Sequence, residues 1–188
     1  MRKSKTDVIV IGAGQAGLAI SYYLTKAKIE HIILERGSIA NAWKNERWDS
    51  FCLVTPNWTI TLPDALDYPV DPDAFMKKDD FVRLLENWAK SFRAPVMEGV
   101  CVSDLSRTGN EFKIVTDSRV FFANQVIIAT ATYQRPKIPQ MLINLDPRWE
   151  LKTAIDYKNP YSLREGAVLV VGSGQSGCQI AEELNNAG

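Results

Sequence analysis

The sequence has few of the side chains from which acid–base, nucleophilic and metal sites are usually built. It contains one histidine, His31, and three cysteines, Cys52, Cys101 and Cys178, which form no C-x-x-C pair and no metal-ligand spacing. We therefore expect no metal site, no Ser-His-Asp catalysis and a structural role for His31 at the start of a strand. Scattered cysteines are typical of reduced thiols, so we expect a cytoplasmic protein.

An excess of charge and a long apolar run are also missing. The 22 basic and 22 acidic residues cancel and form no basic stripe, so nucleic acid is not an expected partner. No segment approaches the length of a membrane span, and glycines interrupt the apolar run near the N-terminus, unlike a signal peptide. The 188 residues, 46% hydrophobic and 23% charged, suffice for one or two globular domains. We expect small-molecule ligands, and the sequence does not indicate the oligomeric state.

The stretch that organises the chain is its start. A short apolar run leads into Gly12, Gly14 and Gly17 at G-x-G-x-x-G spacing, and apolar residues then follow at helical spacing. This pattern predicts a buried strand, a tight turn and a helix. Gly12 permits the turn, Gly14 lets the backbone approach a pyrophosphate, and Gly17 lets the helix pack on the strand. The free N–H groups of the helix start make Gln15 and Ala16 further candidates for cofactor binding.

A second apolar run, residues 29–34, ends at Glu35, where a ribose-binding acid belongs. A carboxylate there accepts hydrogen bonds from ribose hydroxyls and repels a 2′-phosphate, which suits FAD or NAD. Arg36, the next residue, is a further candidate for cofactor binding. The alternative is a glycine turn that binds no ligand, with Glu35 on the surface.

Residues 38–69 form a long stretch with poor periodicity, which is typical of a functional loop or a lid. Its aromatic rings either cover a planar ring system or form a small hydrophobic cluster beneath the loop. The sequence leaves both alternatives open. The tryptophans and prolines of the stretch are Trp43, Trp48, Trp58, Pro56, Pro63 and Pro69.

A helix is predicted after this loop. It starts at Asp79 or Asp80, which supplies an acidic N-cap before the apolar face, and Pro95 ends it. One apolar face at helical spacing is typical of packing on the core. That face is formed by Phe81, Leu84, Leu85, Trp88 and Phe92.

Strand-like segments follow the helix. The first three are separated by turn residues, which predicts an antiparallel meander. A further continuous apolar run predicts a return to a parallel sheet. These segments are residues 96–102, 111–116, 119–122 and 126–129.

The opening pattern then recurs. After residues 140–165, which have the composition of a linker, residues 167–171 predict a second buried strand, followed by Gly172, Gly174 and Gly177 at G-x-G-x-x-G spacing and a helix. Gln175 and Ser176 begin that helix. A repeated strand–glycine–helix unit predicts two dinucleotide sites, and hence two cofactors that exchange electrons.

Together these motifs resemble the N-terminal part of a flavin-dependent monooxygenase-like oxidoreductase, a family with two dinucleotide-binding folds. The resemblance implies FAD at the first glycine motif and NADPH or NADH at the second. It implies an α/β fold, with a Rossmann-like FAD-binding domain over residues 1–139 that contains a parallel sheet and an antiparallel β-meander. A linker over residues 140–165 and the beginning of a Rossmann-like NAD(P)-binding domain over residues 166–188 then follow.

The resemblance also implies roles for single residues. Trp43 and Trp48 resemble the family's segment beneath the flavin, and the backbone of Val100 lies where a strand meets the adenine. Asn57 lies near an asparagine that some members place beside the isoalloxazine, which makes it the catalytic candidate. The alternative for Asn57 is a turn-forming asparagine after proline. The family's A-T-G turn corresponds to Ala129, Thr130 and Ala131.

The chain departs from the family in three respects. Ala131 replaces the glycine of the A-T-G turn. In the fingerprint F-x-G-x-x-x-H-x-x-x-Y, Tyr157 fits the last position, but Thr153, Trp149 and Pro147 replace the histidine, the glycine and the phenylalanine. The sequence also stops one helix into the second unit, so we expect this part alone to be inactive.

The implied reaction is hydride transfer from NAD(P)H to flavin, after which a flavin hydroperoxide oxygenates a small organic substrate. A flavoprotein pyridine-nucleotide reductase of the disulfide-reductase kind, which does not oxygenate, is an alternative, as are a dehydrogenase with a single NAD fold and a non-catalytic nucleotide-binding fragment. The sequence does not identify the substrate or choose between NADPH and NADH.

Overall fold

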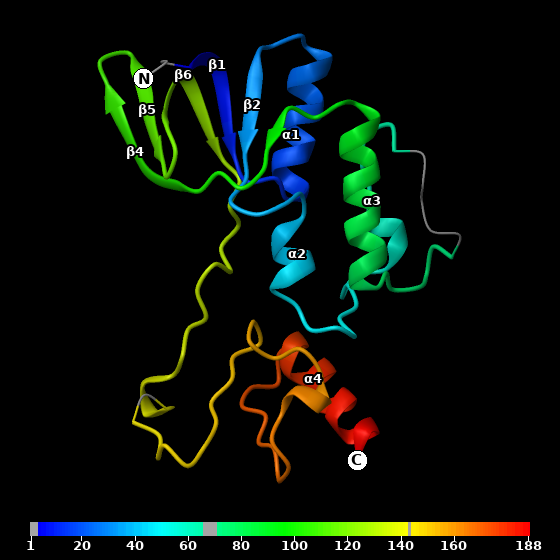
Figure 1. Cartoon of the computed structure of the whole chain (residues 1–188). Coiled ribbons are helices and arrows are strands. Elements are labelled where there is room, and N and C mark those ends of the chain that lie inside the picture. Colours follow the sequence, from blue (N-terminus) through cyan, green and yellow to red (C-terminus); the bar gives the residue numbers. More distant parts are fainter. Residues whose placement is uncertain (1–3, 66–70, 143) are drawn as a thin grey trace.

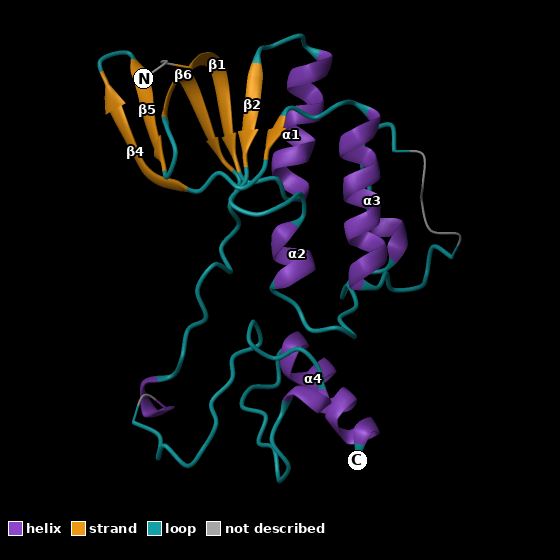
Figure 2. Cartoon of the chain, in the orientation of Figure 1, coloured by secondary structure: helices purple, strands orange, loops and turns teal. Residues whose placement is uncertain are grey.

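A computed structural model describes residues 4–65, 71–142 and 144–188 (Figure 1). Within these residues the chain forms a six-stranded sheet in the order β3-β2-β1-β6-β5-β4, and helices α1 and α3 lie beside it (Figure 2). The chain then leaves the sheet and ends in α4, which lies below α2 in Figure 1. The elements are β1 Ser4–Ile11, α1 Gln15–Lys26, β2 His31–Leu34, α2 Asn41–Asn45, α3 Lys78–Ser91, β3 Val96–Met97, β4 Val102–Thr108, β5 Glu111–Thr116, β6 Val120–Ile128 and α4 Gln175–Ala187, with 3-10 turns at Asn57–Thr59, Gln140–Leu142 and Pro160–Ser162.

The sheet confirms the predicted α/β fold. Strand β1 lies between β2 and β6 and is parallel to both, and β3 is parallel to β2. Strands β4, β5 and β6 form the antiparallel meander. Val8, Ile9 and Val10 of β1 are at most 3% exposed, which explains why this central strand appears in the sequence as a continuous apolar run.

Two predicted strand boundaries are wrong. Residues 96–102 do not form one strand, because β3 pairs with β2 at one edge of the sheet while β4 lies at the opposite edge, so the chain must cross between them. The segments 119–122 and 126–129 belong to one strand, β6, which pairs with β5 on one side and β1 on the other. The exposed Asn124 and Gln125 interrupt the apolar pattern but not the hydrogen-bonded ladder.

Helix α3 supplies the predicted apolar face to the core. Phe81, Leu84, Leu85 and Trp88 are buried, and the Trp88 indole N–H donates to the carbonyl of Pro63 over 2.9 Å. The helix begins earlier than predicted, at Lys78, and its N-cap is Lys77, which makes no side-chain cap bond. Asp79 and Asp80 therefore lie in the first turn, where their negative charges interact favourably with the positive end of the helix dipole.

The predicted buried strand at residues 167–171 is wrong. The segment is not a strand, and Val168, Leu169 and Val171 are 50%, 85% and 62% exposed. The physical reason is pairing, because no strand in the described ranges hydrogen-bonds to it. The glycine turn and helix predicted after it are present, since Gly174 is the N-cap of α4.

Candidate functional site

The first glycine turn joins the carboxyl end of β1 to α1, and its three glycines have different surroundings. Gly12 has a φ of +104°, and a Cβ added to it would lie 2.6 Å from the carbonyl oxygen of Ala129. A Cβ on Gly17 would lie 1.9 Å from the carbonyl oxygen of Gly12, so the close packing of α1 requires glycine. A Cβ on Gly14 would meet nothing within 4 Å. The backbone there is extended, with φ −82° and ψ −174°, so neither the conformation nor the described neighbours require a glycine. The space in front of Gly14 is therefore open.

Glu35 lies beside this turn at the end of β2 and is only 7% exposed, so the surface-glutamate alternative is wrong. One carboxylate oxygen accepts the N–H of Ala13 over 2.8 Å, and the other accepts the N–H of Gly37 over 2.9 Å. Each carboxylate oxygen can accept two hydrogen bonds, so acceptor capacity is left for ribose hydroxyls. Arg36 points elsewhere, because its exposed guanidinium pairs with Glu46.

Several other predicted residues gather around the same turn. The N–H of Val100 donates to the carbonyl of Glu35 over 2.8 Å, and the N–H of Ala129 donates to the carbonyl of Ile11 over 2.8 Å. Thr130 follows directly, and its carbonyl accepts a hydrogen bond from Gln134. The carboxyl ends of the three neighbouring strands β1, β2 and β6 thus meet here, which is where dinucleotides bind to open α/β sheets.

Ala131, which replaces the glycine of the A-T-G turn, adopts the backbone conformation of a glycine. Its φ is +58°, in the left-handed region that glycine adopts without cost. The loop therefore keeps the conformation of a glycine turn, with its methyl group exposed.

The loop after β2 contributes aromatic residues both to the core and to a small pocket. Trp48 is 1% exposed and packs edge-on against Phe51, and its indole N–H has no partner among the described residues. Trp43 is half-buried, with its ring centroid 5.0 Å from that of Phe81. Pro69, the end of the predicted loop, lies outside the described residues. The pocket has a volume of about 180 Å³ and is lined by Gln15, Trp43, Phe51, Leu53, Val54, Thr55, Thr59, Ile60 and Phe81.

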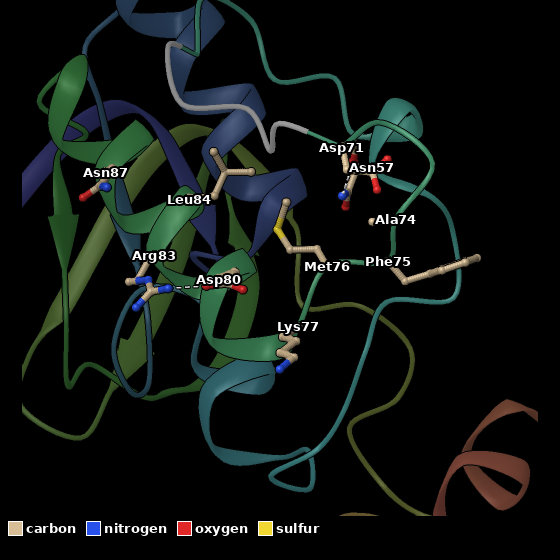
Figure 3. Close-up of a pocket in the computed structure, with 10 residues that line it drawn as sticks. All are labelled: Asn57, Asp71, Ala74, Phe75, Met76, Lys77, Asp80, Arg83, Leu84 and Asn87. Carbon is tan, nitrogen blue, oxygen red and sulfur yellow. Dashed lines mark hydrogen bonds and ion pairs between the residues drawn. The ribbon is translucent and has the colours of Figure 1, made fainter. Parts of the chain in front are cut away.

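Asn57 belongs to a different and larger pocket, of about 640 Å³ (Figure 3). It begins a 3-10 turn after Pro56, as the turn-forming alternative predicts, and is 5% exposed. Its Nδ2 donates to the carbonyl of Asp71 over 2.8 Å, whereas its Oδ1 has no partner within the described ranges. The structure therefore does not place Asn57 in the pocket that holds Gln15 and Trp43. The other lining residues are Asp71, Ala74, Phe75, Met76, Lys77, Asp80, Arg83, Leu84 and Asn87.

The second glycine turn has the same backbone shape as the first. Gly172 has a φ of +111°, and a Cβ on Gly177 would lie 2.0 Å from the carbonyl oxygen of Gly172. Gly174 has φ −76° and ψ 179°, and a Cβ on it would meet nothing within 4 Å. Gln175 and Ser176 are exposed at the start of α4. This turn also presents open space at a helix N-terminus.

The predicted linker makes a contact that sequence reasoning missed. Tyr157 is 4% exposed, and its hydroxyl donates to Glu183 of α4 over 2.7 Å. Burial raises the pKa of Tyr157 well above its usual value, with a smaller contribution from the hydrogen bond to Glu183. The carbonyl of Lys158 accepts the N–H of Asp49 over 2.8 Å. The position of Tyr157 in the fingerprint is the only sequence signal for this contact.

His31 has the structural role predicted for it. It is buried, with Nδ1 2.9 Å from the carbonyl oxygen of Ile29 and Nε2 2.8 Å from the hydroxyl of Ser21. A carbonyl only accepts, so Nδ1 carries the proton in the neutral ring and Nε2 accepts from the hydroxyl. Among the described residues there is no cluster of three potential metal ligands, and no helix there could cross a membrane.

The chain is similar to oxidoreductases over nearly its whole length. It is 40% identical over 181 residues to an uncharacterized oxidoreductase CzcO-like protein of Geobacillus kaustophilus (strain HTA426), which covers 95% of this chain and 51% of that protein. The chain thus spans about half the length of this relative.

Solved structures agree with the predicted fold. A flavin-containing monooxygenase from Stenotrophomonas maltophilia is 25% identical with a TM-score of 0.81, covering 97% of this chain and 56% of that one. The bacillithiol disulfide reductase Bdr (YpdA) from Bacillus cereus is 22% identical with a TM-score of 0.86, covering 98% of this chain and 56% of that one, and this likeness concerns the fold alone. The resemblance to flavin monooxygenase-like oxidoreductases is thereby confirmed. Because residues 9–188 match the family model, the chain belongs to the pyridine nucleotide-disulphide oxidoreductase family.

Proposed function

We propose that the full-length protein is an FAD-dependent oxidoreductase that takes electrons from NADPH or NADH. The observation that carries this proposal is the pair of glycine turns with matching backbone geometry, each leaving open space in front of its central glycine, Gly14 or Gly174. Two such turns suit two diphosphate-containing cofactors.

The residues of the first turn have the chemistry that FAD requires. The N–H groups of Gly14, Gln15 and Ala16 would bind the pyrophosphate, Glu35 the ribose hydroxyls and the backbone of Val100 the adenine. Trp43 and the turn from Ala129 to Ala131 would flank the flavin ring and exclude water from it. When bound, the flavin supplies the redox and oxygen chemistry, and the protein supplies orientation.

The second turn would hold the nicotinamide cofactor. Its N–H groups at Gly174, Gln175, Ser176 and Gly177 lie at the start of α4, where the helix dipole favours phosphate. We infer that residues 166–188 begin the NAD(P)-binding domain and that residues 1–139 form the FAD-binding domain. Residues 140–165 join these two domains, and the hydrogen bond from Tyr157 to Glu183 also holds α4 against this segment.

We infer further that the reaction is oxygenation of a small organic substrate. The likeness to a flavin-containing monooxygenase supports this. We assign to Asn57 a hydrogen bond that its buried Oδ1, which has no partner within the described ranges, accepts from a substrate bound in the larger pocket. Disulfide reduction is the second candidate, favoured by the family description and the shared fold of the bacillithiol disulfide reductase.

An absorbance spectrum of the purified full-length protein tests the proposal. We expect a flavin band that NADPH or NADH bleaches, and oxygen-dependent recovery of the band that is coupled to an oxygenated product. Recovery that gives only hydrogen peroxide contradicts oxygenation. Recovery that needs a disulfide supports the second candidate, and a protein without flavin contradicts the whole proposal.

A further inference from the structure

The side chain of Gln179 joins the two parts of the molecule through an unusual pair of hydrogen bonds. The N–H of Cys52 donates to Gln179 Oε1 over 3.2 Å, and Gln179 Nε2 donates to the carbonyl of Cys52 over 3.0 Å. The amide thus satisfies both backbone groups of one residue, as a neighbouring β-strand would. Among ordinary side chains only an amide offers a donor and an acceptor in this fixed planar arrangement.

The two residues of this contact lie next to the two candidate cofactor sites. Gln179 lies on α4 in the second helical turn after the Gly174 N-cap. Cys52 lies between Phe51 and Leu53, which both line the small pocket beside Gln15 and Trp43. The contact therefore links the helix of the second glycine turn directly to the wall of the first pocket.

Further hydrogen bonds join the end of α2 and the loop after it to the segment that precedes α4. The Lys158 ammonium donates to the carbonyl of Asn45 over 2.6 Å, at the end of α2, and Asn159 Nδ2 donates to Asp49 over 2.7 Å. Ile180, the neighbour of Gln179, is 9% exposed and packs into the main core cluster. The Gln179 bonds thus hold the start of α4 on the loop after α2, and Ile180 adds apolar burial. The hydrogen bonds of Lys158 and Asn159 hold the segment before α4, and α4 lies below α2 in Figure 1.

We propose that Gln179 is a positioning residue that sets how closely the nicotinamide cofactor approaches the flavin. The proposal rests on the proposed function and adds a specific residue to it. The physical reason is that hydride transfer needs the reacting atoms at near-contact distance, and a displacement of about 1 Å can slow a reaction about 100-fold. A contact that joins the two binding elements, without touching either cofactor, controls that distance.

The test uses the full-length protein with Gln179→Ala, which removes both hydrogen bonds, and Gln179→Glu, which removes the donor and adds a charge. Glu182→Gln is the matched control, because Glu182 is exposed on the same helix. Four quantities are measured: flavin content, hydrogen exchange at the Cys52 amide, the Kd of NADP⁺ or NAD⁺, and the rate of flavin reduction. The charge-transfer absorbance between nicotinamide and flavin provides a spectroscopic measure of their approach.

We expect both Gln179 variants to retain flavin. Gln179→Ala, which removes the acceptor of the Cys52 N–H, should exchange the Cys52 amide faster than the wild type, whereas Gln179→Glu keeps that acceptor and loses only the bond to the Cys52 carbonyl. The reduction rate should fall about tenfold and the charge-transfer band should weaken, while the nucleotide Kd changes less than about threefold. Glu182→Gln should behave as the wild type in all measurements.

Two results overturn this proposal alone: an unchanged reduction rate despite faster exchange at Cys52, or a loss of rate matched by an equal weakening of nucleotide binding. If the wild type carries no flavin, or if neither NADPH nor NADH reduces it, the proposed function fails and this proposal with it. The wild-type measurement therefore separates the two failures.

Discussion

The two glycine turns have the same local shape in different surroundings. The φ values of Gly12 and Gly172 are +104° and +111°. A Cβ added to the third glycine of each motif would lie 1.9 or 2.0 Å from the carbonyl oxygen of the first. The strand before the first turn is buried, whereas Val168, Leu169 and Val171 before the second are exposed. A Cβ on Gly12 would meet Ala129, but one on Gly172 would meet nothing within 4 Å. The comparison teaches that a short sequence can specify the turn and the helix, while a buried strand needs neighbouring strands.

The largest expected effects come from substitutions at the central glycines, which should remove a different cofactor from each turn. Gly14→Val should abolish flavin retention, because the added side chain would fill the space that the pyrophosphate needs, although the extended backbone there accepts valine. Gly174→Val should leave flavin bound but abolish reduction by NADPH or NADH. Flavin absorbance after purification and after addition of nucleotide measures both effects. Normal flavin occupancy in Gly14→Val would rule out the placement of FAD at the first turn.

Glu35 distinguishes the first turn from the second. Its carboxylate accepts hydrogen bonds from Ala13 in the turn and from Gly37 in the segment after β2. Glu35→Ala removes charge-assisted hydrogen bonds worth about 1.5–3 kcal/mol, so FAD affinity should fall by about 10- to 150-fold. Titration of the apoprotein with FAD measures the affinity. Glu35→Gln, which keeps one acceptor oxygen, is the control and should fall between wild type and alanine. Equal affinity in all three proteins would show that Glu35 does not bind the cofactor.

Tyr157 tests how the second turn is held. Tyr157→Phe removes the hydrogen bond to Glu183 and should lower the free energy of unfolding by about 1–2 kcal/mol. The pKa of Tyr157 is raised in the folded protein, so its stabilising contribution is complete below the unfolded pKa, about 10, and is lost as the pH rises above that value. Denaturant unfolding from pH 8 to 11 measures this dependence. The phenylalanine variant should show a weaker loss over that range, and an identical loss in both proteins would assign it to other groups.

The smallest expected effect is at Ala131, which adopts the left-handed conformation of a glycine. Ala131→Gly should stabilise the protein by about 0.5–1 kcal/mol, because relief of the backbone strain exceeds the added entropy of the unfolded chain. Urea unfolding measures the change. Ala129→Gly, at a neighbouring residue without a positive φ, should destabilise instead. A destabilised Ala131→Gly variant would mean that the methyl group makes contacts that outweigh the strain.

Much of the fold was predictable because its signals are local. The apolar face of α3, with Phe81, Leu85 and Trp88, follows from helical spacing, and the position of Glu35 follows from the length of one strand–turn–helix–strand unit. The strand boundaries around β3, β4 and β6 were not predictable, because they depend on which strands pair. Asn124 and Gln125 interrupt the pattern of β6, but pairing with β1 continues from Gln125 to Ile128 after the pairing with β5 has ended at Ala123.

The candidate site shows the same division. The glycine turns and the position of Glu35 beside the first of them were visible in the sequence, because they depend on neighbours in the chain or on one short unit. Trp43 was named through the family resemblance. The separation of Asn57 from the pocket of Gln15 was not visible, and neither was the contact between Gln179 and Cys52. That contact joins residues 127 positions apart.

By itself, then, the sequence determined the two turns, their helices and the α/β class, because backbone conformation at glycine and side-chain periodicity are properties of a few adjacent residues. Only the tertiary structure decided which apolar run became a buried strand, where Asn57 lies and how Gln179 of α4 binds the backbone of Cys52. The physical reason is that burial and hydrogen bonding at these places need partners from distant parts of the chain. Residues 167–171, as apolar as residues 8–11 of β1, remain largely exposed where no described strand pairs with them.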